Sequence, residues 1–168
     1  YYQSELFYLM SNLYGPRDTS YVLAGVEFTA GRPVTRFGIG NSIIIQLHTS
    51  TLFDRNELLR ELAHETIHTL SPSPNRPVKI IEEGMAECFS YLYMRDTMKV
   101  IIPPPQSQSY GEAQILVSML LNLDPYAIKR IREDEPKLSK ITKSLILKHF
   151  PILDEGVAAR LTRTFVWD

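Results

Sequence analysis

The chain contains the stretch His64-Glu65-Thr66-Ile67-His68 and, further on, Glu82-Glu83-Gly84-Met85-Ala86-Glu87. These two stretches carry the main prediction of its fold and chemistry. Residues four apart lie on one face of an α-helix, so His64 and His68 can offer two imidazoles to one metal ion. Glu65 lies beside them, where its carboxylate can take a proton from metal-bound water rather than bind the metal. The stretch predicts a helix with two zinc ligands and a general base.

Hydrophobic residues at helical spacing extend this helix over residues 51–70, and Asp54 with Glu57 is typical of a capping box at its start. The helix is expected to end at Ser71-Pro72-Ser73-Pro74-Asn75, because proline disfavours helical geometry in the residue before it. A second amphipathic helix is expected over residues 77–95. The chain therefore turns back quickly and can lay the second helix beside the first.

Glutamates on the second helix can complete the metal site. Glu83 and Glu87 share one face. If the two helices pack side by side, Glu83 supplies a third ligand and leaves the fourth zinc position for water. Glu87, one turn further on, can accept the spare ring N–H of a liganding histidine and fix its tautomer.

With the downstream Glu-Gly-x-Ala-Glu pattern, the middle third of the chain resembles the gluzincin branch of the zinc metallopeptidases. The likeness is to compact single-domain minigluzincins and to the catalytic core of gluzincin aminopeptidases. It implies a zincin-like fold, Zn²⁺ as cofactor and a peptide or protein substrate. In that family the glutamate just before the glycine is the third ligand, which falls on Glu83 here, with Glu82 as the alternative.

The same resemblance implies two further features of the site. A tyrosine just ahead of a helix stabilises the tetrahedral oxyanion in the aminopeptidases, and Ser109-Tyr110-Gly111-Glu112-Ala113 is similar to that stretch, so Tyr110 is the candidate. Family members run an extended strand before the zinc helix that lines the cleft and pairs with substrate backbone. The stretch 41–48 fits this strand, with Ile43, Ile44 and Ile45 as candidate substrate-binding residues.

The aminopeptidases also hold the substrate amine with a glutamate, and Gly38-Ile39-Gly40-Asn41 offers no such carboxylate. An endopeptidase or a restricted processing protease is therefore expected. The second helix is also similar to that of ImmA/IrrE-type peptidases, which cleave repressors, through Glu83-x-x-Ala86-x-x-Phe89-Ser90. A different alternative is a non-catalytic interaction domain in which zinc only ties the helices together; a closed site of that kind needs a fourth protein ligand, such as His48 or Glu87.

Composition limits the remaining possibilities. With 168 residues and 44% hydrophobic content, the chain is expected to form a single domain over 1–168. A net charge of −1 gives no support for nucleic-acid binding, and no apolar run suggests a membrane span. The chain has a single cysteine, Cys88, which excludes an internal disulfide and is expected to be a small buried hydrophobic residue. The absence of disulfides mildly favours a cytoplasmic location. The chain starts Tyr1-Tyr2-Gln3 without Met, which suits a processed form or one domain of something longer, and its oligomeric state is not indicated.

The remaining elements predict an α+β fold, with a small antiparallel sheet near the N-terminus and an all-helical C-terminal half. A hairpin is expected around Gly31-Arg32-Pro33, leading to the strand at 43–48. The proline-rich stretch 101–110 is expected to be a loop that borders the cleft and delivers Tyr110. The expected ranges are helix 4–14, strands 21–29 and 34–37, a helix from 109 or 111 to 123, a new helix start at Asp124-Pro125, and helices 136–150 and 154 to about 164.

Overall fold

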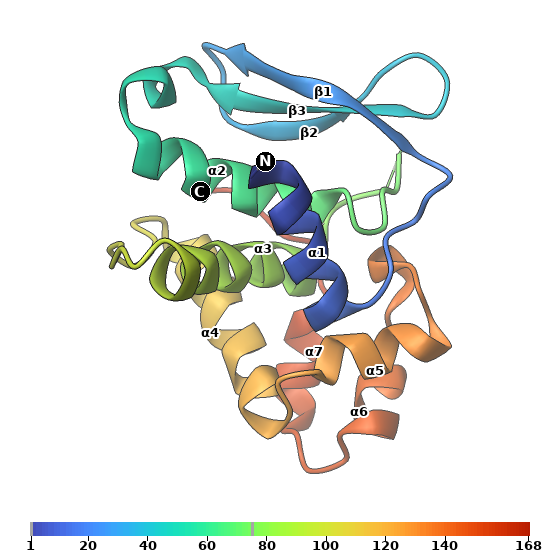
Figure 1. Ribbon diagram of the computed structural model, residues 1–168. Helices are drawn as coiled ribbons and strands as arrows, with labels where there is room; N and C mark the ends of the chain where they lie inside the picture. The colour runs from blue at the N-terminus through green and yellow to red at the C-terminus, as the bar shows by residue number, and fades with distance from the viewer. Residues whose placement is uncertain (1, 75) are drawn as a thin grey trace.

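The computed structural model describes residues 2–74 and 76–168 and has the α+β architecture expected from the sequence (Figure 1). Asn75, in the segment predicted to end the first metal-binding helix, lies outside the described residues. The helices and strands are α1 (Tyr2–Tyr14), β1 (Val22–Thr29), β2 (Val34–Phe37), β3 (Ser42–His48), α2 (Arg55–His68), α3 (Ile80–Leu92), α4 (Gln108–Leu123), α5 (Ala127–Asp134), α6 (Lys143–His149) and α7 (Glu155–Leu161).

The three strands form a mixed sheet in the order β1-β3-β2, with β1 parallel and β2 antiparallel to β3. The predicted hairpin between β1 and β2 and the fully antiparallel sheet are therefore wrong. The tight turn lies instead between β2 and β3, where Gly38 N donates to Ser42 O and Gly40 has a φ of +66°. The chain passes from one edge of the sheet to the other before it enters the centre.

Strand β3 holds the central place and buries every second side chain, whereas the side chains of β1 and β2 are exposed or half-buried. Ile43 and Ile45 point into the core, while Ile44 is half-buried on the opposite face. The expectation that this strand lines the cleft and pairs with substrate needs correction, since β1 and β2 already occupy its two edges. The strand between β3 and the cleft is β2.

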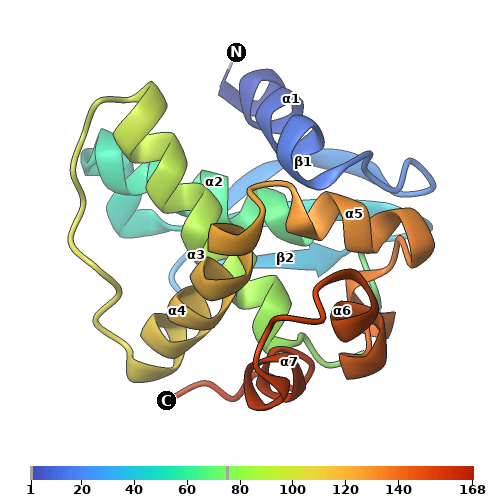
Figure 2. The ribbon, with the colours of Figure 1, turned by 90° about the horizontal axis from the view of Figure 1, so that it is seen from below.

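The sheet lies over α2, and α3 passes beneath α2, as Figure 1 shows. Helices α4 to α7 cover the side of α3 away from the sheet, which is clearest in the view from below (Figure 2). Gly84 permits the close contact between α3 and α4, because a Cβ there would overlap the Ala113 carbonyl and the Val117 side chain. Two helices that carry the motif residues are thus held between the sheet and the C-terminal helices.

At the start of α2, one half of the predicted capping box is present and the other half is not. Asp54 caps the helix as predicted, accepting hydrogen bonds from the backbone N–H groups of Asn56 and Glu57. The Glu57 side chain does not return to the cap; it forms a two-point ion pair with Arg60 instead. A short 3₁₀ turn, Thr49–Phe53, precedes the cap, so the helix begins later than the sequence suggested.

The C-terminal half is helical, as predicted, although its boundaries differ. The helix expected over 136–150 is divided into a 3₁₀ turn, Leu138–Lys140, and α6. Thr142 separates them, because its hydroxyl caps α6 by accepting from the Leu145 backbone N–H. Within the described ranges, none of the helices combines the length and apolar character needed to cross a bilayer.

Candidate metal centre

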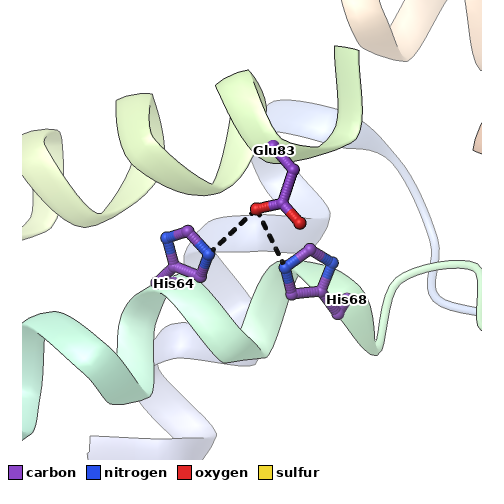
Figure 3. Close-up of side chains that lie close together, drawn as sticks. All are labelled: His64, His68 and Glu83. Carbon is purple, nitrogen blue, oxygen red and sulfur yellow. Dashed lines mark ion pairs between the residues drawn. The ribbon is translucent and has the colours of Figure 1, made fainter. Parts of the chain in front are cut away.

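His64, His68 and Glu83 converge between α2 and α3 (Figure 3). Glu83 Oε2 lies 3.3 Å from His64 Nε2 and 3.7 Å from His68 Nε2. One ligand atom from each residue lies within 4.8 Å of the others. The helical spacing of the histidines and the antiparallel approach of α3 bring the three side chains to a common point, so the predicted cluster does form.

A second pair of carboxylates faces the outer ring nitrogens of the same histidines. Glu87 Oε1 lies 2.9 Å from His64 Nδ1, and Glu82 Oε1 lies 2.8 Å from His68 Nδ1. Each histidine thus turns Nδ1 to an outer carboxylate and Nε2 toward Glu83, the arrangement that fixes a tautomer for metal binding. The sequence left the choice of third ligand open between Glu82 and Glu83. In the structure, Glu83 joins the cluster and Glu82 orients His68.

The buried charges change the protonation of these groups. Burial by itself lowers the pKa of His64, but Glu83 and Glu87 outweigh it and raise the pKa to about 9. Burial also lowers the pKa of His68, which Glu83 and Glu82 raise well above its ordinary value. Burial raises the pKa of Glu83, yet the two histidines hold it below the usual range. A cation at this point, either a proton or a metal, is therefore strongly favoured.

The Glu83 side chain itself shows that these residues fit a metal ion. Its Oε2 atom is buried and receives no hydrogen bond in the described part of the chain, although it faces two imidazole nitrogens. Leaving such an oxygen without a partner is costly unless a cation takes the place of the donor. Two imidazoles and one carboxylate make up a donor set that zinc accepts, with a fourth position open to water.

Glu65 lies in the cleft outside the three-residue cluster, as the motif predicts for a base. It is only 3% exposed, and it lines the cavities on both sides of the cluster. The Thr35 hydroxyl on β2 lies 2.9 Å from Glu65 Oε2 and 3.0 Å from the Glu65 backbone oxygen. Sequence reasoning missed Thr35, because no spacing rule relates a strand residue to a helix residue thirty positions later.

Tyr110 enters the site from the first turn of α4. Its ring meets the His64 ring edge-on at 5.8 Å between centroids, and the Phe165 ring lies tilted against it at 4.9 Å. Burial, with the nearby charge of Glu83, raises the pKa of Tyr110 to about 12, so its hydroxyl keeps a proton to donate at neutral pH. The structure thus brings Tyr110 to the site and leaves its catalytic role as a prediction.

Two cavities adjoin the cluster, one toward each end of α2. The larger has a volume of about 580 Å³ and reaches toward the N-terminal half of α2 and the loop with Pro103–Pro105. The smaller, about 240 Å³, extends past His68 toward Phe37 and Arg76. Trp167 lines both cavities, with the Arg32 guanidinium 4.4 Å from its ring centroid. Together they form a cleft that passes the cluster.

Other candidates from the sequence lie away from the cluster. His48 turns its ring to Ser50, at 2.6 Å between Nδ1 and Oγ, and does not belong to the metal-ligating group found among the described residues. Cys88 is buried, as expected, and burial raises the pKa of its thiol to about 11. Ile43 and Ile45 lie in the core. None of these side chains offers the cluster a fourth ligand.

Comparison with family models, with curated proteins and with solved structures gives no match to this chain. The chemistry of the site therefore has to be argued from its own geometry. That geometry contains a three-residue metal-binding group, a buried carboxylate beside it and a cleft on either side.

Proposed function

We propose that this chain is a zinc-dependent peptidase, acting as an endopeptidase or a restricted processing protease on peptide or protein substrates. The observation that carries the proposal is the meeting of His64, His68 and Glu83, with Glu65 held in the cleft next to them but outside the cluster. A donor set of three protein ligands leaves a coordination position open, which is typical of catalytic rather than structural zinc sites.

When bound, zinc supplies an acidified water and polarises a carbonyl oxygen. Glu65 acts as general base, takes one proton from the attacking water and returns it to the leaving amine nitrogen. Thr35 holds the Glu65 carboxylate through its hydroxyl during both transfers. The Tyr110 hydroxyl donates a hydrogen bond to the oxyanion that develops on the substrate, an interaction worth on the order of 10²-fold in rate.

The outer carboxylates support a catalytic rather than a purely structural site. Glu87, a possible fourth ligand in the non-catalytic alternative, is engaged with His64 Nδ1, and His48 is engaged with Ser50. A tetrahedral site closed by protein alone would have to break one of these contacts. The ImmA/IrrE-like role as a regulatory protease would use the same residues and differs only in its substrate.

The test is the Glu65→Gln variant, because glutamine keeps the shape and the Thr35 contact but cannot accept a proton. We expect zinc content equal to wild type and a loss of peptide hydrolysis of about 10²- to 10⁴-fold, measured by mass spectrometry on a peptide library. Glu133→Gln, an exposed change on α5, serves as the matched control and should keep full activity. Undiminished hydrolysis by Glu65→Gln would remove Glu65 from the mechanism.

A further inference from the structure

The larger cavity has an excess of negative charge. Its lining residues include five carboxylates but only two guanidinium groups, those of Arg32 and Arg60. Arg60 is committed to Glu57 through two contacts, and Arg32 stacks on Trp167 at the rim. The carboxylates are those of Glu57, Glu61, Glu65, Glu87 and Asp168.

Glu61 is a buried carboxylate of this cavity for which the fold provides one hydrogen bond. It is 7% exposed, and its Oε2 accepts one hydrogen bond, from the His48 backbone N–H at 2.9 Å. Within residues 2–74 and 76–168 the structure gives it no ion pair. Glu57, one turn earlier on the same face of α2, adds a like charge, and charges at this spacing repel each other. A buried acid in such a place gains from a cation brought by a ligand.

We propose, building on the proposed function, that this cavity binds a positively charged group of the peptide substrate, an ammonium or a guanidinium. The shared chemistry is a cationic nitrogen, supplied either by a Lys or Arg side chain or by the free N-terminal amine of a short peptide. Glu61 receives the cation directly, and Glu57 adds a longer-range attraction that its ion pair with Arg60 weakens.

The other walls of the cavity suit the stem that carries such a group. Ile102 and Pro103–Pro105 offer apolar surface on one side, and Tyr91 and Trp167 contribute rings. A lysine or arginine side chain buries its methylene groups on surfaces of this kind while its charged end reaches polar partners. A volume of about 580 Å³ lies within the range of sites that enclose a small ligand.

The smaller cavity is less acidic, which gives the proposal a direction along the cleft. Glu82 and Glu83 line it, but both are already directed at histidine nitrogens. Its remaining charges besides Glu65 are Arg32 and Arg76, so a cation is not attracted there once the histidine pairs are formed. A cationic substrate group therefore prefers the end of the cleft at Glu61 over the end beyond His68.

The experiment measures binding separately from hydrolysis. Trp167 is the single tryptophan of the chain and lines the cavity, so its fluorescence reports occupancy of the zinc-loaded protein. The probes are matched pairs: a blocked tripeptide with a central lysine against the same peptide with norleucine, and unblocked tri-alanine amide against its acetylated form. The first pair tests a side-chain cation and the second tests a terminal amine.

We expect at least one cationic probe to bind about tenfold more tightly than its neutral partner, with a preference that weakens as salt is added. Glu61→Gln should reduce the preference to less than about threefold, because glutamine still accepts from the His48 N–H but carries no charge. Glu133→Gln, on the exposed side of α5, should leave the preference intact. Circular dichroism and zinc content of both variants confirm that the fold is kept.

Equal binding within both pairs, no binding of any probe, or a preference that survives Glu61→Gln would overturn the proposal. The outcomes remain separable from those of the proposed function. Cation preference without hydrolysis of any peptide would leave the cavity assignment standing and contradict the peptidase. Hydrolysis without cation preference would support the peptidase and contradict the cavity assignment.

Discussion

Two parts of the molecule bury charge in opposite ways. The interface of α2 and α3 buries five glutamates and His64, whereas the buried charge of α4 to α7, in the described residues, is Arg132. Each of the three nitrogens of the Arg132 guanidinium has a partner in the chain, since they donate to the backbone oxygens of Tyr14, Pro16 and Pro136. Glu83 has no such donor. A buried charge whose hydrogen-bond partners all come from the chain stabilises the fold. A buried charge that lacks such partners indicates a ligand.

The largest expected effect comes from removing the unsatisfied charge. Glu83→Gln should weaken zinc binding by at least about 10³-fold, because a neutral amide replaces one of three ligands. Glu82→Gln and Glu87→Gln should weaken it by only about 10- to 100-fold, since they orient histidines rather than bind the ion. Competition with a chelator of known affinity measures all three. Equal losses for Glu82→Gln and Glu83→Gln would contradict the assignment of Glu83 as the ligand.

Removing the satisfied charge tests the other half of the comparison. Arg132→Met should lower the free energy of unfolding by about 3 kcal/mol, because the buried guanidinium and its three hydrogen bonds to backbone oxygens are lost. The loss should be the same with and without zinc, as measured by urea unfolding. Arg130→Met, on the same helix, is the control: the Arg130 side chain is exposed where it pairs with Asp124, so the change should cost less than about 1 kcal/mol. A zinc-dependent loss for Arg132→Met would mean that the two parts are not independent.

The joint between the two parts is the contact of α3 with α4 at Gly84. Gly84→Ala should destabilise the protein by about 2 kcal/mol, because the new methyl group overlaps the Ala113 carbonyl and forces α4 away. Gly111→Ala, in the same α4, meets open space and should be neutral or slightly stabilising. Thermal unfolding of the two variants gives the comparison. An unchanged unfolding temperature for Gly84→Ala would contradict the close contact of α3 with α4 at this position.

The last prediction concerns the response of the site to pH, which accumulates gradually over several pH units. The pKa of His64 in the metal-free protein is raised from 6.5 to about 9, so zinc must displace a proton throughout this range. Zinc affinity should therefore rise about tenfold per pH unit for each proton displaced, until the pH passes about 9. In the metal-free protein the same shift stabilises the fold below about pH 6.5, and this stabilisation is lost as the pH rises through 9.

Calorimetry in buffers of different ionisation enthalpy counts the released protons directly. At pH 7.5 we expect at least one proton per zinc ion. Zinc binding without proton release would show that the histidines are already neutral, and that the outer carboxylates do not raise their pKa values.

The sequence predicted the helical parts of the site better than the strands. His64, His68 and Glu83 come together because helical spacing and a short connection leave few other arrangements. Strand order had no comparable signal: apolar alternation showed that 43–48 is a strand but not that it is the central one. The choice between Glu82 and Glu83 depends on the rotation of α3 about its axis, which the contact of Gly84 with α4 helps to set.

Thr35 illustrates the same limit at the level of one side chain. A threonine in a short strand has many roles in a sheet, and its distance from Glu65 exists only after β2 takes the edge next to α2. Tyr110 was found through a sequence resemblance, and the structure adds the rings of His64 and Phe165 next to it. Long-range contacts of this kind depend on tertiary packing rather than on local pattern.

The loop with Pro103–Pro105 has a thermodynamic consequence for whatever enters the larger cavity. Proline fixes one backbone torsion and favours an extended chain, so this wall has few alternative conformations in the free protein. A ligand that settles against it has little loop entropy to remove. The binding free energy from contacts with this loop should therefore not be reduced by the entropy cost of ordering the loop.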